Sequence, residues 1–334
     1  MHARRIALFN HESIHQHKIG AIAITEPVQD DDYTEHAALF CTAAAGHWPA
    51  SYNGNLRILG SASLLLPGLY LTARHLVHEW YKDTGSDNMG DPKFMVRLAQ
   101  IVPPEELVTY SIGRYVMDVD DRSPDLALLI THYVEPEKLK LVYEHARGLT
   151  PGVNCHPLDV GDEITLCGFL PSNGPVQNDG STTHYLKLSQ AKGIVEEVHW
   201  NGVGLSRGPT YQVNAKLSGG MSGGPAFNSN GQLVGVNVSS FDLADGQAGN
   251  VSFVAMPWGI FGHQFEVPFQ DGVRATSLLE LCQKKFIKSE GLCHLGRMDS
   301  GLIYHNWSRE CADCVAKALR TDNGRLWLKD KPMD

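Results

Sequence analysis

The residues best suited to chemistry in this 334-residue chain lie in one glycine-rich stretch, Lys216–Asn237 (KLSGGMSGGPAFNSNGQLVGVN). Two pairs of glycines flank Ser222, and Pro225 follows the second pair. Glycine is favoured where φ is positive or where another group must approach closely. The pattern therefore predicts a tight bend with Ser222 at its apex and the N–H groups of Gly220 and Ser222 directed at one point. Such a bend suits a nucleophilic serine, because the two donors can stabilise the oxyanion of a tetrahedral intermediate.

A serine hydroxyl is a weak nucleophile, so it needs a base, and the base needs an acid that orients it. The candidate base is His75, which follows the β-like run Leu69–Thr72; His78 is its local competitor. The candidate acid is Asp125, because it directly precedes the apolar run that begins at Leu126. Three rival acids lie just upstream: Asp118, Asp120 and Asp121. The chain order is therefore base, acid, nucleophile.

Three blocks, GSASLLLPGLYLTARHL, DLALL and GGMSGGP, together resemble the active-site blocks of the trypsin-like serine peptidases of the chymotrypsin superfamily. The likeness is closer to bacterial and HtrA-type members than to secreted digestive enzymes. It implies an all-β fold of two antiparallel six-stranded β-barrels with the site in the cleft between them. It also implies a serine endopeptidase that cleaves protein or peptide substrates with His75, Asp125 and Ser222 and requires no cofactor.

The same resemblance assigns substrate-binding residues in two places. Three lie shortly before the nucleophile, and three directly follow the run Leu233–Asn237, which resembles the strand that binds the substrate backbone. These residues are Lys216, Leu217, Ser218, Val238, Ser239 and Ser240. Trypsin-type enzymes carry at the position of Lys216 the acid that binds Arg or Lys. A lysine there disfavours basic substrates through like-charge repulsion.

The domain organisation follows from the composition along the chain. We expect an N-terminal extension over residues 1–18 and a protease domain over residues 19–262, with barrels at about 19–135 and about 155–262. The composition shifts after about residue 262, and a mostly helical extension is expected over residues 263–334, with helices near Ser277–Lys288 and Cys311–Arg320. Within the first barrel, Glu35–Ala45 reads as a short helix.

Charge and composition exclude several classes of partner. The net charge of −9 argues against a nucleic acid or an anionic membrane. No apolar run approaches the length of a membrane span, and the apolar run near the first residue is too short for a signal peptide. The seven cysteines are an odd number, and none adjoins His75, which favours a cytoplasmic protein with free thiols. The long extension is the candidate docking site for a regulatory protein.

The cysteines of the extension raise the question of a metal site. They are Cys282, Cys293, Cys311 and Cys314. The last two have a zinc-ligand spacing, but the same spacing places two small thiols on one face of a helix, where they pack well. The packing interpretation is preferred, so no metal is expected.

Two other functions fit parts of the pattern. The GxSxG subset around Ser222 is also found in α/β-hydrolases, where Asp271 with His294 or His305 would complete an esterase site. That fold requires a helix directly after the serine, and Gly223-Gly224-Pro225 starts a helix poorly. The other alternative is a catalytically silent barrel that serves as a binding module.

Overall fold

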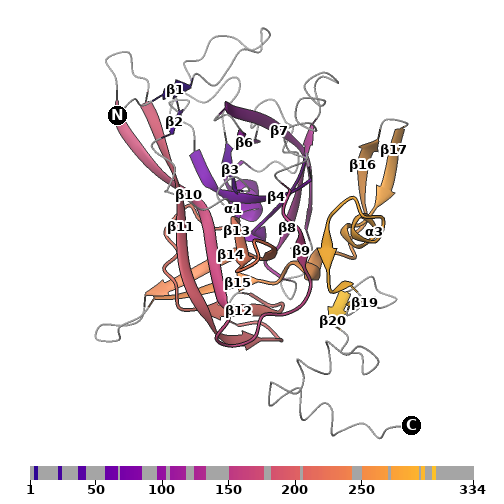
Figure 1. Ribbon diagram of the computed structural model, residues 1–334. Helices are drawn as coiled ribbons and strands as arrows, with labels where there is room; N and C mark the ends of the chain where they lie inside the picture. Colours follow the sequence, from indigo (N-terminus) through magenta and orange to yellow (C-terminus); the bar gives the residue numbers. More distant parts are fainter. Residues whose placement is uncertain are drawn as a thin grey trace, which may run out of the picture.

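The computed structural model describes residues 4–6, 22–24, 37–42, 57–66, 68–84, 96–102, 106–117, 124–132, 150–176, 182–203, 206–242, 250–269, 272–292, 295–297 and 303–305. Most of the described elements are strands, as the sequence predicts. Figure 1 shows the two groups of strands that make up the bulk of the molecule.

The first group is a closed barrel of six antiparallel strands, joined in the order β3-β4-β5-β8-β7-β6. Its strands are β3 (Ala37–Thr42), β4 (Arg57–Leu66), β5 (Leu69–Thr72), β6 (Val96–Val102), β7 (Glu106–Met117) and β8 (Ala127–His132). The predicted helix over Glu35–Ala45 is wrong, because β3 pairs with both β4 and β6 and thereby closes the barrel. Tertiary pairing overrides the local helical preference of this alanine-rich segment.

The second group is a ten-stranded sheet, and hydrogen-bonded ladders join its main strands into a closed circuit. Its main strands are β10 (Glu163–Val176), β11 (Thr182–His199), β12 (Thr210–Val213), β13 (Pro225–Asn228), β14 (Leu233–Asp242) and β15 (Asn250–Ala255). Antiparallel ladders join them in the closed circuit β11-β10-β13-β14-β15-β12-β11. Short strands at its margins are β1 (Arg4–Ile6), β2 (Ile22–Ile24), β9 (Val153–Asn154) and β18 (Ser289–Glu290).

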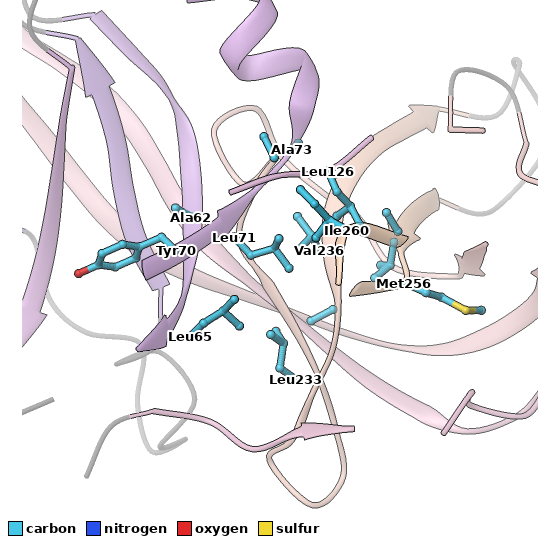
Figure 2. Close-up of a cluster of buried hydrophobic side chains, with 14 of the residues drawn as sticks. Ala62, Leu65, Tyr70, Leu71, Ala73, Leu126, Leu233, Val236, Met256 and Ile260 are labelled. Carbon is cyan, nitrogen blue, oxygen red and sulfur yellow. The ribbon is translucent and has the colours of Figure 1, made fainter. Parts of the chain in front are cut away.

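One hydrophobic core runs through both groups of strands. Figure 2 shows part of this core, which includes Leu71 of β5, Val236 of β14 and Ile260. Ile260 belongs to η2 (Pro257–Ile260), a short 3-10 helix whose residues are all buried. Burial of this shared apolar surface holds the loops at the junction in place.

The described part of the extension differs from the helical prediction. It contains the hairpin β16 (Phe265–Phe269) and β17 (Gly272–Thr276), the helix α3 (Leu278–Gln283), and the short strands β18 (Ser289–Glu290), β19 (Leu295–Arg297) and β20 (Ile303–His305). The predicted helix at Ser277–Lys288 is therefore confirmed only as α3, whose N-cap Ser277 accepts a hydrogen bond from Glu280 N at 3.2 Å. The predicted helix at Cys311–Arg320 lies outside the described residues.

The extension is joined to the second sheet by backbone hydrogen bonds. Strand β18 pairs in parallel with β9, which in turn pairs with β14. Val153 N donates to Lys288 O at 2.8 Å, and Cys155 N donates to Glu290 O at 2.9 Å. Strand β18 of the extension is thus an added strand of the second sheet, next to β9 and one strand away from β14.

Candidate active site

His75 lies at the start of α1 (Arg74–Thr84), the helix that follows β5. Leu76, Val77 and Trp80 are buried and fix this helix against the first barrel. His78, the competing base, is exposed on the same helix. Residues three apart lie on nearly the same helix face, so the hydrogen bonds to Asp125, which only His75 makes among the contacts described, distinguish the two histidines.

Asp125 lies just before β8 and is buried. Its Oδ2 lies 2.7 Å from His75 Nδ1, and its Oδ1 accepts a hydrogen bond from His75 N at 2.8 Å. An ionised carboxylate only accepts hydrogen bonds, so the Nδ1 of a neutral His75 must carry the proton. Nε2 is then an acceptor, and the imidazole is 42% exposed. The rival acids Asp118, Asp120 and Asp121 lie outside the described residues.

Ser222 lies in the turn before β13, between Gly220 and Gly223, which both have positive φ (100° and 85°). Its backbone oxygen and the side chain of Leu76 both border Gly60, where a Cβ would lie 2.7 Å and 2.6 Å from them. The serine turn therefore packs against the start of α1. Ser222 Oγ donates to Val238 O over 3.5 Å, and no hydrogen bond joins it to His75 among the described residues.

The backbone N–H groups around Ser222 fall into two sets. Met221 N, Gly223 N and Gly224 N donate to Ser218 O, Asn237 O and Met221 O. Among the backbone hydrogen bonds of the described residues, Gly220 N and Ser222 N donate to no acceptor. Two unused donors with one residue between them are the arrangement that can stabilise an oxyanion.

Asn237, a fully buried residue of β14, supports this turn and was not among the residues singled out by sequence. Its Nδ2 donates to Cys167 O at 2.8 Å and to Met221 O at 3.3 Å. Met221 O belongs to the peptide group that carries Ser222 N–H, so the Asn237 amide orients that donor. The only signal in the sequence is a polar residue at the end of the apolar run LVGVN.

The six predicted substrate-binding residues lie on two neighbouring segments. Leu217 is buried, and its N–H donates to Ser252 Oγ at 3.1 Å, while Ser218 is partly exposed. Val238 is buried in β14, and its carbonyl accepts the Ser222 hydroxyl. Ser239 is partly exposed, and the side chain of Ser240 is outside the described residues.

Lys216 is exposed, whereas its neighbours Ala215 and Leu217 are buried. Its ammonium therefore does not form the buried base of a pocket. Any repulsion of a basic substrate by Lys216 would act at the rim of the site and would weaken with added salt.

The candidate metal ligands give no assembled site in the part of the chain that the structure describes. No group of three or more His, Cys, Asp or Glu side chains there is arranged to hold a metal ion. Cys282 is buried in α3 and forms no disulfide. Cys293, Cys311 and Cys314 lie outside the described residues.

Cys282 gives a testable pH dependence of stability. Burial raises the pKa of its thiol from 9.0 to about 11, and a hydrogen bond with Ser289 offsets part of that rise. Between these two values the unfolded thiol loses its proton while the folded thiol keeps it, so stability falls as pH rises. When the pH is raised from 8 to 11, we expect the free energy of unfolding to fall by about 2 kcal/mol less in Cys282→Ala than in the unaltered protein. Urea unfolding at both pH values measures the difference, and equal losses would contradict the assignment.

No helix within the described ranges has the length and apolarity that a bilayer crossing requires.

The barrel and the hydrogen-bonded pair of His75 and Asp125 beside the Ser222 turn fit the trypsin-like class of peptidase folds. The family model described as the trypsin-like peptidase domain matches residues 60–236, just over half of the chain, and this match includes His75, Asp125 and Ser222. The chain therefore belongs to the trypsin-like peptidase family. No curated protein matches the sequence.

Several solved structures of proteases are similar to the chain. Deg5 is 16% identical, with a TM-score of 0.41 over 67% of this chain and 84% of that chain. The protease domain of MamO from Magnetospirillum magneticum is 16% identical, with a TM-score of 0.38 over 68% of this chain and 93% of that chain. The HtrA-type protease AlgW, solved with a decapeptide, is 15% identical, with a TM-score of 0.40 over 77% of this chain and 74% of that chain.

Proposed function

We propose that this trypsin-like peptidase is a serine endopeptidase with Ser222 as nucleophile, His75 as general base and Asp125 as the acid that orients the base. The observation that carries the proposal is the double hydrogen bond from His75 to the Asp125 carboxylate. This pair fixes the imidazole in the tautomer whose Nε2 can take a proton. It also places a buried negative charge where an imidazolium would form.

The proposed reaction begins when the Ser222 side chain rotates from Val238 O to His75 Nε2. The existing bond to Val238 O is 3.5 Å long, so little is lost when it breaks. As Oγ attacks the scissile carbonyl, its proton passes to Nε2, and the carbonyl oxygen becomes an oxyanion between Gly220 N and Ser222 N. His75 then gives the proton to the leaving amine, and a water molecule hydrolyses the acyl-enzyme by the reverse route.

We propose that the closed circuit of ladders from β10 to β15 is the second barrel of the peptidase domain. In this proposal the domain spans residues 19–262, follows an N-terminal extension over residues 1–18, and is followed by an extension over residues 263–334. The substrate would lie between the two barrels, beside β14. Limited proteolysis tests the boundaries: a folded fragment ending near residue 262 would support them, and its absence would show that the extension, whose strand β18 pairs with β9, belongs to the domain.

We further propose that the enzyme performs regulated proteolysis in the cytoplasm and that the extension receives a regulatory protein. The ladder between β18 and β9 supports this proposal, because it links the extension to the strand that pairs with β14. Fractionation of cells that express the full chain tests the location, and a membrane or secreted fraction would contradict it.

One observation favours the alternative of a catalytically silent binding module. The hydroxyl of Ser222 is bonded to Val238 O rather than to His75. If this arrangement persisted with substrate bound, the serine would not be activated.

Labelling with a fluorophosphonate probe separates the two functions, because the probe reacts covalently only with an activated serine. We expect the full-length protein to be labelled and the variant Ser222→Ala to remain unlabelled. Absence of labelling in folded, full-length protein would support the silent module and refute the peptidase.

A further inference from the structure

Ser61 is a fully buried polar residue of β4 that contacts the Ser222 turn. Side chains alternate between the two faces of a strand, so Ser61 and Ser63 share one face while Ala62 and Leu64 occupy the other. The hydroxyls of Ser61 and Ser63 both reach carbonyls of the turn, those of Gly220 and Gly223. A strand of the first barrel thus places two hydroxyls beneath the loop that carries the nucleophile.

Ser61 holds the turn at two points. Its backbone N–H donates to Ser222 O at 2.7 Å, and its hydroxyl donates to Gly220 O at 2.7 Å. Gly220 and Ser222 are the same two residues whose unused N–H groups would bind the oxyanion. Ser61 therefore fixes the carbonyl of each residue that offers a donor to the substrate.

The direction of the hydroxyl proton is settled by a third contact. Phe169 N, in β10, donates to Ser61 Oγ at 2.9 Å. Because an N–H group can only donate, the Ser61 oxygen accepts there and its single proton is left for Gly220 O. The side chain is thereby locked, and Thr72 Oγ1 also fixes the Ser61 carbonyl at 2.8 Å.

Gly220 requires such support more than Ser222 does. Gly220 has a φ of 100°, and because a glycine adopts several other conformations as easily, the backbone alone does not hold this one. The peptide group that carries Ser222 N–H is held through Met221 O by Asn237 Nδ2 and Gly224 N. Gly219, whose peptide group carries Gly220 N–H, is exposed. The bond from Ser61 to Gly220 O holds the peptide group that follows Gly220, and thereby limits rotation at the residue whose N–H is the more adaptable of the two donors.

We propose that Ser61 is a positioning residue for the oxyanion site, acting through its hydroxyl on the Gly220–Met221 peptide group. This inference rests on the proposed peptidase function. It predicts that loss of the hydroxyl slows attack by Ser222 without changing the basicity of His75, because Ser61 has no contact with the pair formed by His75 and Asp125 among the contacts described.

The test compares Ser61→Ala with Ser63→Ala. Ser63 is the matched control, since it is buried on the same strand face and donates to Gly223 O at 3.2 Å. Gly223 offers no N–H group to the oxyanion, because its N–H donates to Asn237 O. The readout is the second-order rate of fluorophosphonate labelling as a function of pH, measured well below each variant's Tm. We expect labelling of Ser61→Ala to be about 10- to 100-fold slower than that of the unaltered protein. This loss is smaller than the one expected when an oxyanion donor itself is removed. We expect Ser63→Ala to stay within about threefold of the unaltered protein, and the pH midpoint to be unchanged in both.

Ser61→Cys is the second variant, for the case in which Ser61→Ala does not fold. It nearly keeps the size of the side chain but replaces a strong hydrogen-bond donor with a weak one. It should fold and label at a rate between those of the unaltered protein and Ser61→Ala. Unchanged labelling in folded Ser61→Ala or in Ser61→Cys, or equal losses in Ser61→Ala and Ser63→Ala, would overturn the proposal. A shifted pH midpoint would also overturn it, because the effect would then pass through His75. If the unaltered protein is not labelled at all, the peptidase proposal itself fails.

Discussion

Ser222→Ala, His75→Ala and Asp125→Asn are each expected to lower the rate of peptide hydrolysis by on the order of 10⁴-fold while the protein stays folded. The serine variant loses the nucleophile, and the histidine variant loses the group that takes its proton. The asparagine variant keeps the shape of Asp125 but can no longer accept both hydrogen bonds from His75 as a carboxylate. Hydrolysis of a fluorescently labelled protein substrate measures the loss, and circular dichroism verifies the fold.

His78→Ala is the matched control for the histidine variant. It removes an exposed imidazole from the same helix, three residues from His75. We expect its turnover to stay within about twofold of the unaltered protein, as for surface substitutions in general. Near-full activity of Asp125→Asn together with loss of activity in Asp121→Asn would show that the acid is assigned wrongly.

Gly223→Ala is expected to be the most destabilising single-methyl addition in the Ser222 turn. Gly223 has a φ of 85°, which an alanine adopts at a cost of about 1 to 2 kcal/mol. Its added Cβ would also overlap the backbone oxygen of Ser61 and the hydroxyl of Thr72, and both of these residues are fully buried. We expect a total loss of about 3 to 5 kcal/mol in the free energy of unfolding, together with loss of labelling at Ser222.

Gly219→Ala serves as its control in the same turn. A Cβ at Gly219 meets no atom within 4 Å, and its φ is not positive. Urea unfolding should place this variant within about 1 kcal/mol of the unaltered protein. Similar stability losses in the two variants would mean that the close packing of Gly223 against β4 and β5 does not hold the turn.

Local sequence was enough to predict the conformation around the candidate catalytic residues. The glycines around Ser222 predicted the bend, and Gly220 and Gly223 do adopt positive φ. The position of Asp125 directly before an apolar strand predicted a buried acid beside His75, and the two are hydrogen-bonded. These features depend on backbone conformation and strand burial, which neighbouring residues encode directly.

Tertiary structure decided the features that depend on partners far away in the sequence. Residues Ala37–Thr42 form a strand because β4 and β6 flank them, although their composition favours a helix. The choice between His75 and His78 required the hydrogen bonds between His75 and Asp125, which lies 50 residues further along the chain. Ser61 lies 159 residues from Gly220, and the apolar run that contains it gives no sign that its hydroxyl reaches the turn. Hydrogen bonds of this kind form only when a strand and a distant turn pack together, so their partners are determined by packing rather than by local pattern.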